Sequence, residues 1–366
     1  METRPNAMQR LQAQALIDDV PLSVILELTN RCNERCVHCY VDLDDVRGEL
    51  TTDEVLRILD ELRAAGTLFL TLTGGEIFLR KDALPIARRA RELGFALRLF
   101  SNGTLIDEEK ACAIAEIGPL AVELSLFSLD PEKHDAVTRR PGSLDKTLRA
   151  ARLLTERGAT VVLKAPLMHG LADERRAVAA FARSIGASSK FDPTIVSRYD
   201  QDDAPLAFRL TPDDFRGLCR DPEMGLAVDP SGLTPPDDGG AVCSSARRVA
   251  LISARGEVFP CSQRFPSAGS LRERTFAEIW ATSPILLRLR NVTWGDLRTC
   301  AGCVNASFCG RCHLDAKLED GDFFGPSRWA REMAEARKDA FGRGGATREE
   351  SVARRFDGKD PVSELG

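Results

Sequence analysis

Hydrophobic and polar positions alternate with two different periods along residues 21–196. Apolar runs with the length of buried parallel strands cover residues 24–29, 68–73, 96–100, 121–127, 160–165 and 190–196. Amphipathic stretches with the period of a helix lie between them, over residues 52–62, 82–93, 107–117, 144–157 and 173–185. Six strand–helix repeats predict an α/β fold with a parallel sheet. This pattern fits an open doubly wound sheet as well as a sheet curled into a partial barrel.

The pattern changes on both sides of this segment, and it predicts four parts. They are an N-terminal extension (1–20), the α/β domain (21–215), a small cysteine-rich domain (216–325), and a terminal helix with a disordered tail (326–366). Within the third part, residues 248–253 and 257–260 predict a hairpin that ends at Cys261. A helix is expected over residues 271–280, beyond the hairpin.

Composition and charge exclude several classes of protein. The chain is 43% hydrophobic and 29% charged, with a formal net charge of −5, so it shows no basic surplus for binding nucleic acid. No apolar run reaches the ~18 residues of a membrane span. Most of the 11 cysteines lie in closely spaced groups and no export signal is apparent, which favours metal binding in a reducing cytoplasm over disulfides.

Three cysteines follow the first predicted strand at the spacing C-x3-C-x2-C. The thiolates of Cys32, Cys36 and Cys39 are soft ligands, typical of iron–sulfur clusters or zinc. A structural zinc site would need a fourth ligand such as His38. Three cysteines alone would suit a four-iron cluster with one iron left open to a small molecule.

The other strands also end in candidate site residues. The second predicted strand leads into Gly74-Gly75-Glu76, where backbone can approach a ligand closely and a carboxylate can accept from an ammonium group. A tight turn with a solvated acid would have the same sequence. Lys164 lies within the fifth run and would be costly to bury unpaired. It is either a cavity contact to a cofactor or substrate, or part of an internal ion pair.

The C-x3-C-x2-C motif, with Gly-Gly-Glu after the next strand, resembles the radical S-adenosylmethionine (radical SAM) enzymes. The resemblance implies a partial (β/α)6 TIM-like barrel in which Cys32, Cys36 and Cys39 hold a 4Fe-4S cluster. The open iron of this cluster would bind S-adenosylmethionine, whose cleavage gives a 5′-deoxyadenosyl radical. It also implies that His38 lies near the adenine and that Gly74, Gly75 and Glu76 bind the methionine amino group. The ribose and carboxylate would contact Asn102, Ser125 and Arg139.

Six further cysteines lie in the C-terminal part: Cys243, Cys261, Cys300, Cys303, Cys309 and Cys312. Zinc ribbons would explain their spacing. The arrangement also resembles the SPASM domain, a small iron–sulfur domain with auxiliary 4Fe-4S clusters. The resemblance implies that Cys243, Cys261 and Cys312 share one cluster, and that Cys300, Cys303 and Cys309 share another. No cysteine follows Cys312, so one or two auxiliary clusters are expected. His313 or Asp315 is a candidate for the missing ligand.

Two cysteines fall outside these motifs. We expect Cys112 to be a core residue, since a free cysteine often behaves as a small hydrophobe, and Cys219 to be a candidate fourth ligand of the first auxiliary cluster.

The resemblance implies an enzyme that abstracts a hydrogen atom from a ribosomally made peptide, leading to crosslinking, epimerisation or oxidation. The His-Cys-Tyr ending of the first motif resembles the pyrroloquinoline quinone and modified-haem branches of the family. Alternatives are a maturase of haem or another small cofactor, and, from another class, a zinc-stabilised binding module. Expected partners are the peptide, a separate peptide-docking protein and an external one-electron donor of flavodoxin or ferredoxin type. The sequence identifies no catalytic acid or base.

Overall fold

The computed structural model describes residues 6–221, 239–262, 266–297, 299–300 and 302–342. The chain forms two compact units. The first comprises residues 1–209 and 239–293, and the second comprises residues 210–238 and 294–366. This division differs from the predicted boundaries at residues 215 and 325.

Six parallel strands form the main sheet of the first unit. They are β1 (Ser23–Glu27), β2 (Phe69–Thr73), β3 (Ala96–Ser101), β4 (Ala121–Ser125), β5 (Val161–Pro166) and β6 (Ser188–Asp192). Each strand pairs in parallel with the next one in sequence. An open doubly wound sheet would reverse direction at a switch point, so this sequential order identifies the winding of a barrel.

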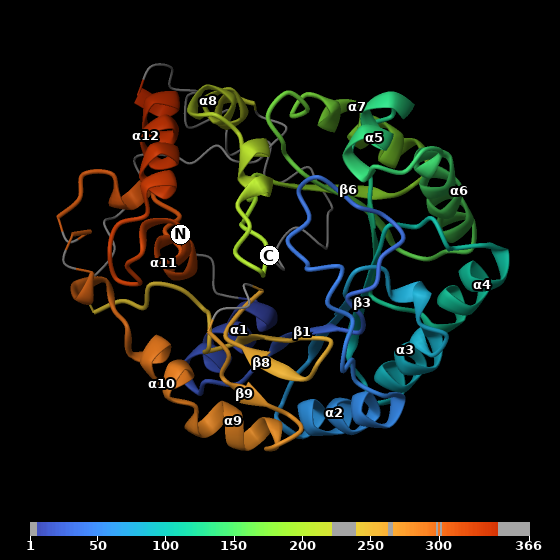
Figure 1. The fold of residues 1–366 in the computed structure, drawn as a ribbon, viewed down its shortest axis with the longest axis horizontal. Helices are drawn as coiled ribbons and strands as arrows, with labels where there is room; N and C mark the ends of the chain where they lie inside the picture. The colour runs from blue at the N-terminus through green and yellow to red at the C-terminus, as the bar shows by residue number, and fades with distance from the viewer. Residues whose placement is uncertain (1–5, 222–238, 263–265, 298, 301, 343–366) are drawn as a thin grey trace. The chain divides into compact units, whose positions relative to one another are not determined.

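Helices connect these strands and cover their outer face (Figure 1). They are α2 (Thr52–Ala64), α3 (Ala83–Glu92), α4 (Glu108–Ile117), α5 (Pro131–Thr138), α6 (Ser143–Glu156) and α7 (Glu174–Ser184), with a 3-10 turn, η1 (Ile77–Leu79), after β2. The start of α2 follows from its sequence. The Thr51 hydroxyl accepts from the Glu54 N–H, while the Glu54 carboxylate accepts from the Thr51 N–H, and this reciprocal capping box satisfies two free donors.

A hairpin continues the sheet beyond β1. Its strand β7 (Val249–Ile252) pairs in parallel with β1, then β8 (Glu257–Phe259) and β9 (Gly269–Ser270) follow in antiparallel order. The hairpin forms where it is predicted and ends two residues before Cys261. It belongs to the barrel sheet because β7 satisfies the backbone groups at the open edge of β1. The carboxyl end of β1 therefore lies beside the turn between β7 and β8, and β8 runs back from this turn toward Cys261.

The N-terminal extension contains a helix, α1 (Ala7–Ile17), which begins with a capping box between Asn6 and Gln9. Two predictions need correction. The helix predicted over 271–280 begins only at Phe276 (α9, Phe276–Thr282), where Thr275 provides the cap, and α10 (Pro284–Asn291) follows it. Cys112 is exposed rather than buried, and the Arg157 Nε–H donates to its sulfur over 3.1 Å.

The second unit is helical in its described part. It contains α8 (Pro212–Arg220), the 3-10 turns η5 (Trp294–Asp296) and η6 (Ala306–Phe308), α11 (His313–Asp320) and α12 (Arg328–Gly342). Helices α8 and α12 pack together, with the Arg337 guanidinium 5.2 Å from the centre of the Phe215 ring. Within the ranges that the structure describes, no helix is long and apolar enough to cross a membrane.

Candidate active site

The cysteine loop, defined as residues 30–40, follows the carboxyl end of β1 and is anchored at its start and in its middle. Glu49 binds its start, accepting from the Thr29 hydroxyl at 2.6 Å and pairing with Arg31 at 2.7 Å. Further along, the Arg35 and Val37 N–H groups donate to carbonyls of Thr138 and Val137 at the end of α5. The loop is therefore fixed by protein contacts before Cys32 and on both sides of Cys36.

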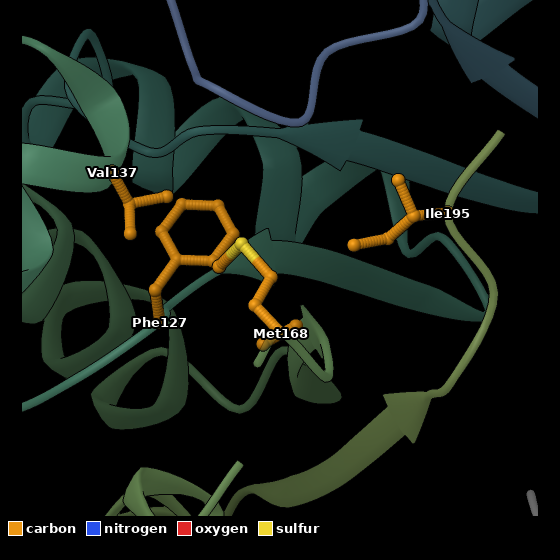
Figure 2. Close-up of a cluster of buried hydrophobic side chains, with 5 residues drawn as sticks. Phe127, Val137, Met168 and Ile195 are labelled. Carbon is orange, nitrogen blue, oxygen red and sulfur yellow. The ribbon is translucent and has the colours of Figure 1, made fainter. Parts of the chain in front are cut away.

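A buried apolar cluster supports the middle of the loop. Phe127, Val137, Ala165, Met168 and Ile195 form this cluster, and Cys36 and Val37 pack against it. Figure 2 shows Phe127 and Met168 between Val137 and Ile195. Its members follow or flank strands β4, β5 and β6. The loop thus lies over the carboxyl edge of the sheet, where parallel α/β folds place their active sites.

The three thiols of this loop are neighbours. Burial and the negative charges of nearby groups together raise the pKa of Cys32 to about 12, and burial is the larger cause. One of these nearby groups is Cys39. Burial also raises the pKa of Cys36, with added contributions from Cys39 and Cys32. Among the described residues, no three His, Cys, Asp or Glu side chains converge as the ligands of a single metal ion would. Three neighbouring thiols are the ligand set of a four-iron cluster that leaves one iron open.

The Gly-Gly-Glu turn is packed directly against the start of the cysteine loop. The Gly75 N–H donates to the Thr29 carbonyl and the Glu76 N–H to the Arg31 carbonyl, both at 2.8 Å. A Cβ on Gly74 would lie 2.2 Å from the Thr29 oxygen, and one on Gly75 would lie 2.3 Å from the Arg31 oxygen. Gly74 also has φ +148°, which disfavours any side chain. Only glycine fits at these two positions.

The Glu76 carboxylate is completely buried and accepts several hydrogen bonds. Its donors are the Phe78 N–H (3.0 Å), the Asn102 N–H (2.7 Å) and the Ser101 hydroxyl (2.9 and 3.0 Å). Burial raises the pKa of Glu76, against the lowering effect of these donors. Three donor groups leave part of the acceptor capacity of a carboxylate unused. The turn after β2 is thus tied to the end of β3.

Asn102 joins the end of β3 to the cysteine loop. Its side-chain amide donates to Asn33 Oδ1 at 2.8 Å and lies 3.9 Å from the Cys32 sulfur. Ser125, at the end of β4, is half-buried and lies opposite Lys164 of β5. Arg139 is exposed at a left-handed position after α5. Its neighbour Arg140 instead donates to the Asn33 carbonyl of the loop.

His38 lies within the loop with its ring against Phe127, edge-on, with 5.0 Å between centroids. Burial lowers its pKa to about 4, and its Nδ1 has no hydrogen-bond partner.

Glu34, which sequence reasoning missed, is buried between two cysteines, and its Oε2 accepts from the Cys36 thiol over 3.7 Å. Its Oε1 is also without a hydrogen-bond partner. The sequence signal that could have identified Glu34 is an acidic residue between the first two cysteines of the C-x3-C-x2-C motif. Buried unsatisfied atoms at this loop fit a site that takes up a further group.

Two tyrosines link the cysteine loop to the hairpin. Tyr40 and Tyr199, the only tyrosines in the chain, contact each other edge-on at 5.2 Å. The Tyr199 hydroxyl donates to the Ser262 carbonyl at 3.1 Å and lies 3.3 Å from Glu27 Oε1. Tyr40 follows Cys39 and Ser262 follows Cys261. These contacts bring the two cysteine segments of the first unit together, which the sequence did not indicate.

The remaining cysteines divide between the units. Cys243 and Cys261 belong to the first unit and Cys312 to the second, so their sharing of one cluster stays a prediction. Within the second unit, burial raises the pKa of Cys309, with contributions from Cys300 and Cys303, so these three sulfurs are neighbours. His313 shares its Nδ1 with Arg311 and the Phe323 carbonyl, and Asp315 is buried two residues further along α11. Cys219 is buried in α8, and the positive charge of Arg337 partly offsets the rise in its pKa that burial causes.

Comparison with known proteins explains this arrangement. The family model of the radical SAM superfamily matches residues 26–182, and that of SPASM, an iron–sulfur cluster-binding domain, matches residues 243–304. The chain is a radical SAM enzyme with a SPASM domain. Its cofactors are therefore S-adenosylmethionine and iron–sulfur clusters. Both resemblances inferred from the sequence motifs are confirmed.

Similar proteins act on different substrates. An AdoMet-dependent heme synthase of Methanosarcina barkeri is 28% identical over 335 residues, covering 83% of this radical SAM enzyme and 95% of that protein. A PqqA peptide cyclase of Granulibacter bethesdensis is 26% identical over 328 residues, covering 82% and 85% respectively. SuiB of Streptococcus suis, solved with S-adenosylmethionine, has a TM-score of 0.67 at 16% identity, covering 90% of this chain and 84% of SuiB. SuiB was also solved with its precursor peptide SuiA. The likeness to SuiB confirms the fold, a partial barrel with a C-terminal iron–sulfur domain.

Proposed function

We propose that this radical SAM enzyme modifies a ribosomally made peptide by abstracting a hydrogen atom from one of its carbons. The observation that carries the proposal is the shared edge of the sheet. There the cysteine loop and the Gly-Gly-Glu turn lie at the carboxyl ends of β1 and β2, and the Tyr199 hydroxyl links Glu27 at the end of β1 to Ser262 beside Cys261. The peptide substrate is supported by the PqqA peptide cyclase relative and by SuiB.

The residues at this edge of the sheet suit the two cofactors, which are the iron–sulfur cluster and S-adenosylmethionine. Cys32, Cys36 and Cys39 would hold the cluster, and Glu76 with the Gly74-Gly75 backbone would hold the methionine end of S-adenosylmethionine. His38, Asn102, Ser125 and Arg139 are the proposed contacts of its remaining parts. Bound together, these groups supply a radical able to remove hydrogen from an unactivated carbon. The protein positions the cofactor, fixes the loop and excludes water through the Phe127 cluster.

A second candidate is maturation of haem or another small cofactor. It is supported by the heme synthase relative, since the alignment spans 95% of that protein. A peptide-docking protein and an external one-electron donor belong to the proposal for the peptide reaction.

Cleavage of S-adenosylmethionine tests the proposal. The anaerobically reconstituted, reduced protein should release 5′-deoxyadenosine, measured by chromatography, even without substrate. The triple variant Cys32→Ala, Cys36→Ala, Cys39→Ala should release none. The Cys112→Ala variant is the matched control, because this exposed cysteine lies outside the site, and it should behave as the native protein does. Cleavage that persists in the triple variant would refute the assignment, and a colourless zinc protein would favour the binding module.

A further inference from the structure

Three charged side chains lie together on neighbouring strands of the barrel. Arg98 comes from β3, Glu123 from β4 and Lys164 from β5. The strand residues that alternate with them, such as Leu124, face the covering helices, since Leu124 and Ala150 of α6 both lie near Gly103. Side chains alternate between the two faces of a strand, so the charged residues occupy the inner face of the barrel.

Two cations share one carboxylate in this group. Glu123 Oε1 lies 3.5 Å from Arg98 Nη1, and Glu123 Oε2 lies 3.5 Å from Lys164 Nζ. The Lys164 ammonium also lies over the Phe100 ring, 4.1 Å from its centre. The exposed fraction falls from 32% for the Lys164 side chain to 14% for Arg98 and 3% for Glu123. Lys190 and Asp192 of β6 also act on Lys164, but their charges cancel. The group therefore carries one surplus positive charge.

The hydrogen bonding of this group is incomplete. Charge-assisted N–H···O bonds are normally about 2.7–2.9 Å long, shorter than either contact of Glu123. Arg98 Nε and Glu123 Oε2 are buried and have no hydrogen-bond partner. Buried polar groups almost always have partners. An anionic group placed beside the two cations would balance the surplus charge and accept from the free Arg98 Nε–H, whereas Glu123 Oε2 is an acceptor that an anion does not satisfy.

We propose that Lys164, with Arg98 and Glu123 beneath it, binds a carboxylate of the substrate. Lys164 pairs with Ser125, the last residue of β4, so it lies at the carboxyl edge from which a substrate enters. It is also the most exposed of the three. A substrate with an acidic side chain close to the reacting carbon is the class that fits. The inference rests on the proposed function, because it takes the barrel as the place where the substrate binds.

The test uses the α-methylamide of N-acetylglutamate as the probe, which carries one carboxylate, and the α-methylamide of N-acetylglutamine as its neutral isostere. Binding to the full, reconstituted protein is measured by saturation-transfer NMR with S-adenosylmethionine present, so that the cofactor's own carboxylate site is filled. The charged probe should bind at least about tenfold more tightly than the neutral one, as loss of a hydrogen bond to a charged group predicts. Neither probe has to react, so this result is independent of whether the proposed reaction occurs.

Variants give the decisive comparison. Lys164→Met should reduce binding of the charged probe at least about tenfold, Lys164→Arg should keep it, and Glu123→Gln should strengthen it by removing the competing carboxylate. Lys146→Met is the matched control, because Lys146 is exposed on α6. Equal binding of the two probes, or an unchanged affinity in Lys164→Met, would show that the group is only an internal ion pair. A loss of S-adenosylmethionine affinity in Lys164→Met, with probe binding retained, would assign Lys164 to the cofactor and also overturn the proposal.

Discussion

At the scale of single residues, the site is defined by side chains that are already engaged with the protein. Glu76 is the clearest case, because a carboxylate in a turn would normally be solvated, yet this one is buried on two backbone N–H groups and a hydroxyl. Such an environment orients the carboxylate before any cofactor arrives. A preoriented group loses little entropy when it binds its ligand.

Replacing Glu76 tests its proposed role. Glu76→Gln exchanges a hydrogen bond to a charged group, worth about 1.5–3 kcal/mol, for a neutral one, so affinity for S-adenosylmethionine should fall roughly tenfold or more. Isothermal titration measures the affinity, and iron content shows whether the cluster is intact. An unchanged dissociation constant with full iron would mean that Glu76 only accepts the Phe78 and Asn102 N–H groups.

The sequence predicts which residues belong to the site where the spacing of a motif is enough to identify them. It does not where three-dimensional contacts decide the matter. The three cysteines of the first motif and the two glycines of the turn stand where their spacing placed them. Arg139 and Arg140 are adjacent and equivalent in the sequence, but the structure places Arg139 at an exposed left-handed position and Arg140 in contact with the Asn33 carbonyl of the loop. Cys112 was expected in the core because a free cysteine often behaves as a small hydrophobe, yet it lies on the exposed side of α4.

At the scale of elements, the period of hydrophobic positions located all six barrel strands to within a few residues. The largest error is β6, which begins two residues and ends four residues earlier than expected, because its exposed residues weaken the pattern. The pairing of β7 with β1 could not be predicted, since residues so far apart in sequence carry no local signal of each other. For the same reason the sequence could not distinguish a barrel from an open doubly wound sheet, and the strand order in the structure identifies the barrel.

The packing of the turn against the loop predicts the effect of one added methyl group. Gly75→Ala would bring a Cβ to 2.3 Å from the Arg31 oxygen, so the cysteine loop must shift. Overpacking of this kind typically costs about 1–3 kcal/mol, and both iron content and S-adenosylmethionine affinity should fall.

Gly217→Ala is the matched control for this substitution. Among the described residues outside its own helix backbone and its chain neighbours, no atom lies within 4 Å of a Cβ built on Gly217, and the residue is within helix α8, so the melting temperature should not fall. Normal iron content and cofactor affinity in Gly75→Ala would show that the loop moves without consequence for the site.

At the scale of the whole molecule, the property of the cysteine-rich part to be measured is the number of auxiliary clusters that it holds. Cys300, Cys303 and Cys309 are neighbours in the second unit, and the sequence contains no cysteine after Cys312. We predict a second auxiliary cluster whose remaining iron is bound by a non-cysteine ligand or left open. Iron and sulfide analysis of the variant lacking Cys32, Cys36 and Cys39 should therefore give two four-iron clusters per chain. A single cluster would show that all six downstream cysteines serve one centre.

The pairing of β7 with β1 has a consequence for synthesis of the chain. Strand β1 is made at residues 23–27, but its partner at 249–252 leaves the ribosome only after more than 220 further residues. At typical translation rates this takes roughly 10 to 45 seconds. Throughout that interval one side of β1 has no native partner, and a free strand edge readily pairs with other chains. Newborn copies of this protein are therefore most vulnerable to aggregation before translation finishes, and slower synthesis would lengthen the exposure rather than relieve it.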